Sequence, residues 1–416
     1  MTTANENPER RRAPRLARRL SALAGALLVV LLVHVLQGRQ EGPLLVQAQK
    51  NLVFADSPLG QAMERHGYLR PPLYPLLLWA GVRAGVSPPR VNELLFLATL
   101  GLVALYARRA LRGVRPLWPV LLLAVAHFDH GNVYQPVAET LFVALLLLLT
   151  LGLLREQREG SHASLVIVAA ATAGLGLTRY FALFFPVPVV AANLVLLPPR
   201  PLRSRLKRAA AALAVGLAPI AWWLLQARRH TGYWTGDDRS APRHLPEAVR
   251  HWSELTGFGS HVVLTVKTLV IDFFSPAFPA GLAVVTRPWR PGVVETAGLA
   301  LFLVAGFFCL RGVVSGRAAV LSPWREETRD GGFLVLELVL AFYAATLAVW
   351  TWGNNDPINT RFLYPSYALL VLLGFHAWSL VRSQGALARA AFRALYALTF
   401  AVQLWRSLFA LPLPIR

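Results

Sequence analysis

Residues Gln37 to Pro75 read QGRQEGPLLVQAQKNLVFADSPLGQAMERHGYLRPPLYP. This polar interval lies between an apolar segment at 20–37 and a long succession of apolar runs that begins after Pro71. It holds a dense set of ionisable side chains in a protein that is poor in charge overall. We therefore expect a loop that builds a site at a membrane surface. Its ionisable residues include Glu41, Asp56, Glu64, Arg65, His66 and Arg70.

The composition of the whole chain indicates a membrane protein. Of its 416 residues, 55% are hydrophobic and only 15% are charged, and the mean hydropathy is +0.48. In soluble proteins, roughly a quarter of the residues are charged. Long apolar runs recur along the chain, as expected for helices that cross a bilayer. We therefore predict an all-α, polytopic membrane protein.

The distribution of positive charge agrees with this prediction. The formal net charge is +21, and many of the arginines fall in clusters between the apolar runs. Cytoplasmic loops of membrane proteins collect Lys and Arg in this way, and nearby anionic lipids attract them. We therefore predict membrane lipids as partners and no nucleic acid. The clusters lie at residues 10–19, 108–115, 200–208 and 382–393.

The first apolar segment predicts an uncleaved membrane anchor. Residues 1–19 are basic and form a predicted cytoplasmic tail, and no small-residue cleavage site follows Leu36. Residues 72–86 are too short for a span of about 20 residues. If they crossed, the arginines after the run at 91–107 would lie outside, against the positive-inside bias. We therefore predict that residues 72–86 form a helix along the outer interface.

The remaining runs then predict a single integral-membrane domain, residues 20–416, with about 11 transmembrane helices. Extracytoplasmic loops are predicted at 38–90 and 228–291, each with an interfacial helix, and a basic cytoplasmic loop at 198–208. The C-terminus lies outside in this topology. The predicted spans are 20–37, 91–107, 116–135, 138–154, 164–178, 181–197, 209–227, 292–310, 333–351, 364–381 and 394–410.

Two carboxylates are candidate catalytic groups at the predicted outer face, where unpaired ionisable groups are costly and functional candidates by default. Glu41 follows the first span and could serve as a general base or bind a divalent cation; its structural alternative is to offset Arg39. Glu139 stands in the first turn of a predicted span. A carboxylate there also interacts favourably with the helix N-terminus, which is the structural alternative.

Three arginines at the same face are candidates for binding a phosphate. Arg70 precedes Pro71 and Pro72, Arg179 lies at a predicted outer turn, and Arg361 comes directly before the span at 364–381. Arg179 could instead extend to the interface along its aliphatic stem, and Arg361 could pair with Asp356 to order a loop. Together, the carboxylates and arginines suit an anionic, lipid-linked substrate and acid–base chemistry on its head group.

The sequence requires no metal or cofactor, although a divalent cation could assist the chemistry. The tetrapeptide HFDH contains His127, Asp129 and His130, but on a helix residue 129 points away from the other two. We therefore favour the interpretation that these residues line the mouth of the substrate site. The single cysteine, Cys309, excludes an intrachain disulfide and a cysteine metal cage.

Four passages resemble, in order and spacing, the GT-C fold glycosyltransferases. The closest patterns are those of the bacterial relatives of dolichyl-phosphate-mannose protein mannosyltransferases and of the lipid A aminoarabinose transferase. The resemblance covers nearly the whole chain in layout. The passages are RHGYLRPPLYPLLLWAG (65–81), NVYQPVAETLFVALLLL (132–148), AGLGLTRYFALFFPVP (173–188) and DPINTRFLYPSYALLVLLG (356–374).

This resemblance implies transfer of a sugar from a polyprenyl-phosphate carrier to an extracytoplasmic glycan, lipid or protein acceptor, at the cell (inner) membrane. It assigns the catalytic acids to Glu41 and Glu139 and the contacts to the lipid phosphate to Arg70 and Arg361, with Arg179 in support. The remaining candidates for substrate binding are His66, Tyr68, Gln135 and Asp356.

The chain departs from the family pattern at two positions. The acid in the first loop is usually Asp before a run that contains tyrosine, but here it is Glu41 before Gly42 and Pro43. The aminoarabinose branch has an acid where this chain has Leu69, which argues against that branch's metal site. Two alternatives therefore stay open: a transporter or flippase of a lipid-linked solute, and an inactive scaffold in an envelope assembly complex.

Overall fold

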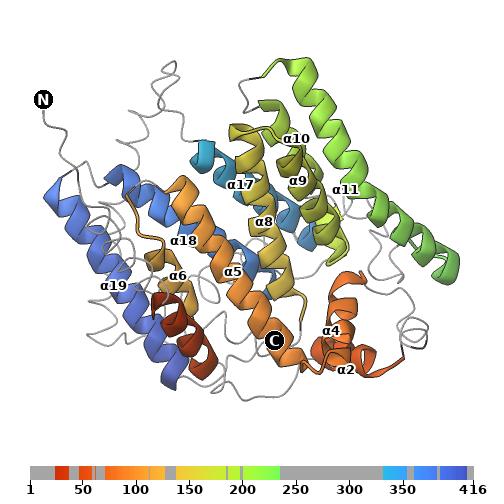
Figure 1. The fold of residues 1–416 in the computed structure, drawn as a ribbon, viewed down its shortest axis with the longest axis horizontal. Coiled ribbons are helices and arrows are strands. Elements are labelled where there is room, and N and C mark those ends of the chain that lie inside the picture. The colour runs from red at the N-terminus through yellow and green to blue at the C-terminus, as the bar shows by residue number, and fades with distance from the viewer. Residues whose placement is uncertain are drawn as a thin grey trace, which may run out of the picture.

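Within the described residues, the chain is all-helical. The computed structural model describes residues 24–36, 46–58, 61, 71–111, 113–126, 137–183, 186–196, 200–234, 331–353, 360–381 and 385–409. A helix at Ala24–Leu36 precedes the labelled elements (Figure 1). These are α2 (Val46–Asp56), α4 (Leu73–Arg83), α5 (Pro88–Ala110), α6 (Leu117–Ala124), α8 (Glu139–Arg158), α9 (His162–Gly176), the 3₁₀ helix η1 (Tyr180–Leu183), α10 (Pro186–Leu196), α11 (Leu202–Thr231), α17 (Gly331–Gly353), α18 (Thr360–Val381) and α19 (Ala386–Phe409).

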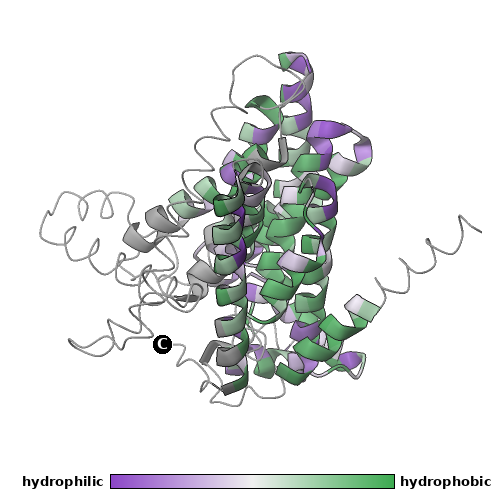
Figure 2. Cartoon of the chain, turned by 90° about the vertical axis from the view of Figure 1, so that its left-hand side faces the viewer, coloured by the Kyte–Doolittle hydropathy of each residue, from purple (hydrophilic) through white to green (hydrophobic). Residues whose placement is uncertain are grey.

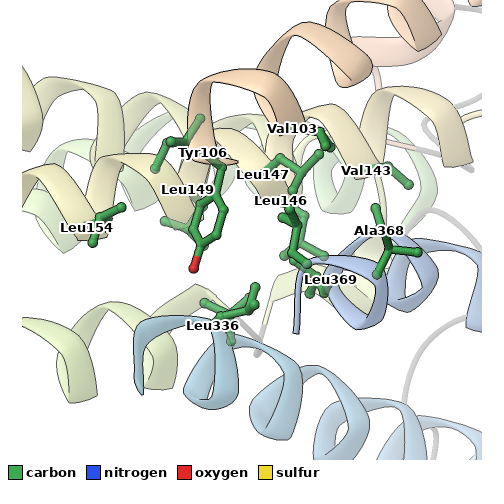
Figure 3. Close-up of a cluster of buried hydrophobic side chains, with 14 of the residues drawn as sticks. Val103, Tyr106, Val143, Leu146, Leu147, Leu149, Leu154, Leu336, Ala368 and Leu369 are labelled. Carbon is green, nitrogen blue, oxygen red and sulfur yellow. The ribbon is translucent and has the colours of Figure 1, made fainter. Parts of the chain in front are cut away.

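Helix α8 forms the centre of the bundle. Of its 20 residues, 15 are buried, and it packs against α5, α9, α17 and α18 (Figure 1). A helix that is apolar all round needs neighbours on every side. Figure 3 shows some of these contacts: Tyr106 and Val103 from α5 and Leu336 from α17 lie around the leucines of α8.

Short turns with defined caps set the antiparallel course of α8 and α9. Gly160 adopts a φ of +57°, a conformation that side chains disfavour, and thereby turns the chain after α8. Ser161 then caps α9, because its hydroxyl accepts a hydrogen bond of 3.2 Å from the backbone N–H of Ser164. At the far end of α11, Gly232 adopts a φ of +79° and closes that helix.

Interhelical contacts define two ends of the bundle. At the first, Arg158 on α8 donates to the Arg109 carbonyl on α5 at 2.7 Å, and Arg200 beside α11 donates to the Glu159 carbonyl at 3.0 Å. We call this the basic end (residues 108–110, 155–161 and 200–208). At the other, the backbone N–H of Leu73 donates to the Leu177 carbonyl at 2.9 Å. We call this the site end (residues 71–74, 137–140 and 177–180).

Two described helices, α5 and α11, are long and apolar enough to cross a membrane. Helix α11 lies at the edge of the bundle and exposes large apolar side chains, such as Val215 and Trp222, which are 66% and 60% exposed. Figure 2 shows hydrophobic residues along the middle of the bundle and many hydrophilic residues toward its ends. This pattern suits a helix bundle in contact with lipid.

The structure confirms a helix within 72–86, at Leu73–Arg83, and corrects several other expectations. The basic loop predicted at 198–208 is helical from Leu202 onward, because Leu, Arg, Lys and Ala are strong helix formers. Arg361 lies in the first turn of α18 rather than before the helix, since α18 begins at Thr360. Helix α2 was not predicted at all.

Three predicted spans also differ in extent from the helices found. Helix α6 ends at Ala124, so it covers only the first part of the span predicted at 116–135. The spans predicted at 164–178 and 181–197 correspond to α9 and α10, which have 15 and 11 residues. Both are shorter than the about 20 residues of a full span. The tail at 1–19, the interfacial helix at 262–285 and the span at 292–310 lie outside the described residues.

Gly216 provides a test of the packing between α9 and α11. A Cβ atom there would lie 3.0 Å from the Ala169 carbonyl oxygen and 3.0 Å from Thr172 on α9. We expect Gly216→Leu to lower the free energy of unfolding by about 1–3 kcal/mol, because the two backbones cannot both stay in place. Thermal unfolding of the purified protein measures this loss.

Gly101 on α5 is the matched control. It is exposed, and a Cβ atom there would meet nothing within 4 Å. We expect Gly101→Leu to leave stability unchanged or raise it by up to about 1 kcal/mol, since leucine loses less backbone entropy in a helix than glycine does. Equal destabilisation by both substitutions would contradict close packing at Gly216.

Candidate functional site

The candidate site is a buried ion pair between Glu139 and Arg179 at the site end. Glu139 is the first residue of α8, and Arg179 lies between α9 and η1. The Arg179 guanidinium donates a hydrogen bond through Nη2 to Glu139 Oε1. The Glu139 side chain is 1% exposed, whereas the Arg179 side chain is 16% exposed. The carboxylate is therefore enclosed, and the guanidinium keeps some access from outside the bundle.

The local sequence explains why both charges lie here. Glu139 stands at the N-terminus of α8, where unpaired backbone N–H groups favour a negative charge. At the end of α9, the Thr178 hydroxyl donates to the Gly174 carbonyl at 2.6 Å, and the Arg179 N–H donates to the Leu175 carbonyl at 3.1 Å. These bonds close the last turn of α9 and direct the chain, with Arg179, across the start of α8.

Helix α4 covers the pair from one side. Its first N–H is bound to the Leu177 carbonyl, two residues before Arg179. The buried Tyr74 hydroxyl donates to Asn92 Oδ1 on α5 at 2.8 Å. Burial raises the pKa of Tyr74 well above its ordinary value, with the Asn92 hydrogen bond lowering it and the charge of Glu139 raising it further. Tyr74 therefore remains a neutral donor.

Helices α17 and α11 contribute aromatic residues to the same end. The buried Tyr343 on α17 interacts electrostatically with both Arg179 and Glu139, and its ring lies 6.0 Å from that of Phe142, one turn after Glu139. On the η1 side, Trp223 Nε1 donates to the Tyr180 hydroxyl at 3.1 Å. Tyr74 from α4 and Tyr343 from α17 are thus close enough to interact electrostatically with the ion pair, and the Trp223–Tyr180 bond fastens α11 to the segment directly after Arg179.

The structure brings together two of the residues selected from the sequence, Glu139 and Arg179, which are 40 positions apart. Arg361 is placed in the first turn of α18, and its side chain is outside the described part of the structure. The other selected residues lie outside the described residues: Glu41, His66, Tyr68, Arg70, His127, Asp129, His130, Gln135 and Asp356.

Sequence reasoning missed three residues beside the pair: Tyr74, Asn92 and Tyr343. Tyr74 belongs to the quoted passage LRPPLYP but received no role, and Asn92 and Tyr343 lie in apolar runs where one polar atom is unremarkable. The hydrogen bond between Tyr74 and Asn92, which are 18 positions apart, is visible only in the structure. Among the described residues, no group of three His, Cys, Asp or Glu side chains could hold a metal ion.

The arrangement can bind an anion through Arg179 while Glu139 holds the guanidinium in one orientation. A guanidinium has five donors in a planar fork and binds carboxylate and phosphate oxygens alike. No family model and no curated protein matches this chain. The assignment of function therefore depends on the residues of the chain itself.

Proposed function

We propose that this protein is a membrane glycosyltransferase of the GT-C type, which moves a sugar from a polyprenyl-phosphate carrier to an extracytoplasmic acceptor. The observation that carries the proposal is the Glu139–Arg179 pair at the bundle end where the Pro-Pro helix α4 is fastened. An enclosed carboxylate that orients a partly exposed guanidinium is suited to binding a lipid-linked phosphate. The proposal includes the multi-pass topology with about 11 spans.

In this mechanism, Arg179 contacts the donor phosphate, together with Arg70 and Arg361. Glu139 acts as a positioning residue, since a carboxylate that is 1% exposed and bonded to Arg179 is poorly placed to meet an acceptor. Removal of either Glu139 or Arg179 would leave the other charge buried without a countercharge, which strongly destabilises the folded state. This explains why both charges are retained.

Transfer then needs one proton acceptor and one stabilised leaving group. The acceptor oxygen attacks the anomeric carbon, the bond from that carbon to the phosphate oxygen breaks, and the hydroxyl proton passes to Glu41. The polyprenyl phosphate leaves with its negative charge held by the arginines, which lowers the barrier electrostatically. His66, Tyr68, Gln135 and Asp356 complete the proposed substrate site. The scheme requires no divalent cation, although one could assist.

Binding of polyprenyl phosphate to the purified protein tests the phosphate site. We expect the lipid to raise the Tm of the wild type by linkage, and we expect the increase to be lost in Arg179→Gln and reduced in Arg179→Lys, which keeps the charge but not the planar fork. Arg229→Gln is the control, because Arg229 is an exposed cation in the last turn of α11. Each shift is measured against the variant's own Tm without lipid.

Transfer itself is tested by the release of polyprenyl phosphate from polyprenyl-phosphate hexose and pentose donors in membranes. We expect Glu41→Ala to bind the lipid normally and to abolish release. Full release by Glu41→Ala would contradict its role as proton acceptor. Equal lipid-induced shifts in the wild type and Arg179→Gln would contradict the phosphate site. Binding without release from any donor by the wild type would favour a flippase.

A further inference from the structure

The basic end of the bundle contains a recess that the proposed transferase site does not use. It lies where the end of α8, the end of α10 and the start of α11 meet, and it is shallow and open to solvent. The recess therefore suits a phosphate-sized group held at its mouth rather than an enclosed ligand. Its lining residues are Glu156, Gln157, Asn193, Leu194, Arg200, Arg205 and Arg208.

The lining is cationic even after its internal ion pairs are counted. Arg208 binds the buried Glu156 through two nitrogens, the Nη2–Oε2 distance being 2.7 Å, and Arg200 lies 3.5 Å from the same carboxylate. The lining thus holds three guanidiniums and one carboxylate, which leaves two positive charges uncompensated among the lining residues. A bound anion would balance them.

Buried polar atoms of Arg205 and Asn193, which line this recess, have no hydrogen-bond partner among the described residues. They are Arg205 Nε, a donor, and Asn193 Oδ1, an acceptor, on a residue that is 4% exposed. The orientation of the Asn193 amide is set by its Nδ2, which donates to the Val189 carbonyl at 2.9 Å. Buried polar atoms are rarely left without a partner. A ligand that complements both atoms must therefore offer an acceptor and a donor close together.

Gly160 keeps Arg200 at the recess. A Cβ atom at position 160 would overlap the Arg200 guanidinium, which lies over this glycine and donates to the neighbouring Glu159 carbonyl at 3.0 Å. The positive φ of Gly160 also disfavours any side chain there. A substitution at Gly160 therefore displaces one of the three guanidiniums without changing the charge of the chain.

We propose that this recess binds the head group of an anionic phospholipid whose phosphate is followed by a hydroxyl-bearing group, as in phosphatidylglycerol. The phosphate accepts hydrogen bonds from Arg205 and Arg200, and a head-group hydroxyl donates to Asn193 Oδ1. Basic pockets between helices at a membrane surface bind such head groups. The inference rests on the membrane location in the proposed function and is independent of the transfer chemistry.

Native mass spectrometry of the detergent-purified full-length protein, titrated with one lipid at a time, tests this site. We expect phosphatidylglycerol to bind at least about tenfold more tightly than phosphatidylcholine, a difference of about 1.4 kcal/mol. Arg205→Gln and Gly160→Ala should each remove most of this preference. Asn193→Leu should keep the preference for an anionic lipid but remove the preference for phosphatidylglycerol over phosphatidic acid, which has no head-group hydroxyl.

Arg203→Gln is the matched control, since Arg203 is exposed on the same turn of α11 and does not line the recess. It should bind phosphatidylglycerol like the wild type. An equal loss in Arg203→Gln and Arg205→Gln would overturn the proposal, because diffuse surface charge would then explain binding. Competition by millimolar inorganic phosphate that depends on Arg205 would overturn the lipid as the ligand and identify free phosphate instead. Loss of transfer activity alone leaves these results unchanged, so the two proposals fail separately.

Discussion

Replacement of Arg179 by alanine is expected to lower the free energy of unfolding by about 3–5 kcal/mol, because it leaves the enclosed Glu139 carboxylate without its countercharge. Denaturant unfolding in detergent measures this loss. Arg179→Lys should cost less, since an ammonium keeps the charge. For the same reason, the double variant Glu139→Leu with Arg179→Leu should recover much of the stability, because hydrophobic pairs often replace buried ion pairs at little cost.

The double variant also separates stability from function. It should fold with a Tm above that of Arg179→Ala and yet show no stabilisation by polyprenyl phosphate, since the phosphate contact is gone. If Arg179→Ala unfolds at the same denaturant concentration as the wild type, the pair does not stabilise the bundle as its burial requires. If the double variant still responds to the lipid, Arg179 does not contact the phosphate.

Replacement of Glu156 by glutamine is expected to have opposite effects on stability and on lipid binding. Glu156 is buried, accepts a hydrogen bond of 2.6 Å from Ser164 and binds Arg208. Removal of its charge should lower the free energy of unfolding by about 3 kcal/mol. This value is at the low end of the cost of breaking a fully buried pair, because the Arg208 side chain is partly exposed. The same change adds a net positive charge to the recess and should tighten the binding of phosphatidylglycerol.

These two effects are measured on one sample by a thermal melt and a lipid titration. Glu159→Gln serves as the control, because Glu159 is exposed, bonds Arg155 at 2.5 Å and does not line the recess. We expect it to change stability by no more than about 1 kcal/mol, as for other exposed pairs. Weaker lipid binding by Glu156→Gln would contradict the electrostatic account of the recess.

Much of the helical layout could be predicted from the order of apolar runs. The runs at 91–107 and 138–154 became α5 and α8, and the short apolar run at 72–86 contains α4. The ends of helices were harder to predict. Helix α11 continues through its arginines because their long side chains favour helix, so polarity alone is a poor guide to a helix boundary.

Pairing between distant residues was beyond the reach of sequence patterns. Glu139 and Arg179 were both selected as charges that are costly to bury, but only the packing of α8 against α9 shows that they neutralise each other. Glu156 was missed because it lies between Arg155 and Arg158, just after the span predicted at 138–154. Its partner Arg208 is 52 positions later, at the start of α11.

The bond between the Leu73 N–H and the Leu177 carbonyl has a consequence for the construction of chimaeras. Because Pro71, Pro72 and Pro75 have no N–H, this bond is a large part of the backbone attachment at the start of α4. A graft that joins a foreign first loop upstream of Pro71 keeps the attachment. A graft that joins the foreign loop within α4 separates it from the turn that carries Arg179. We therefore expect first loops to be exchangeable between proteins only at a junction upstream of Pro71.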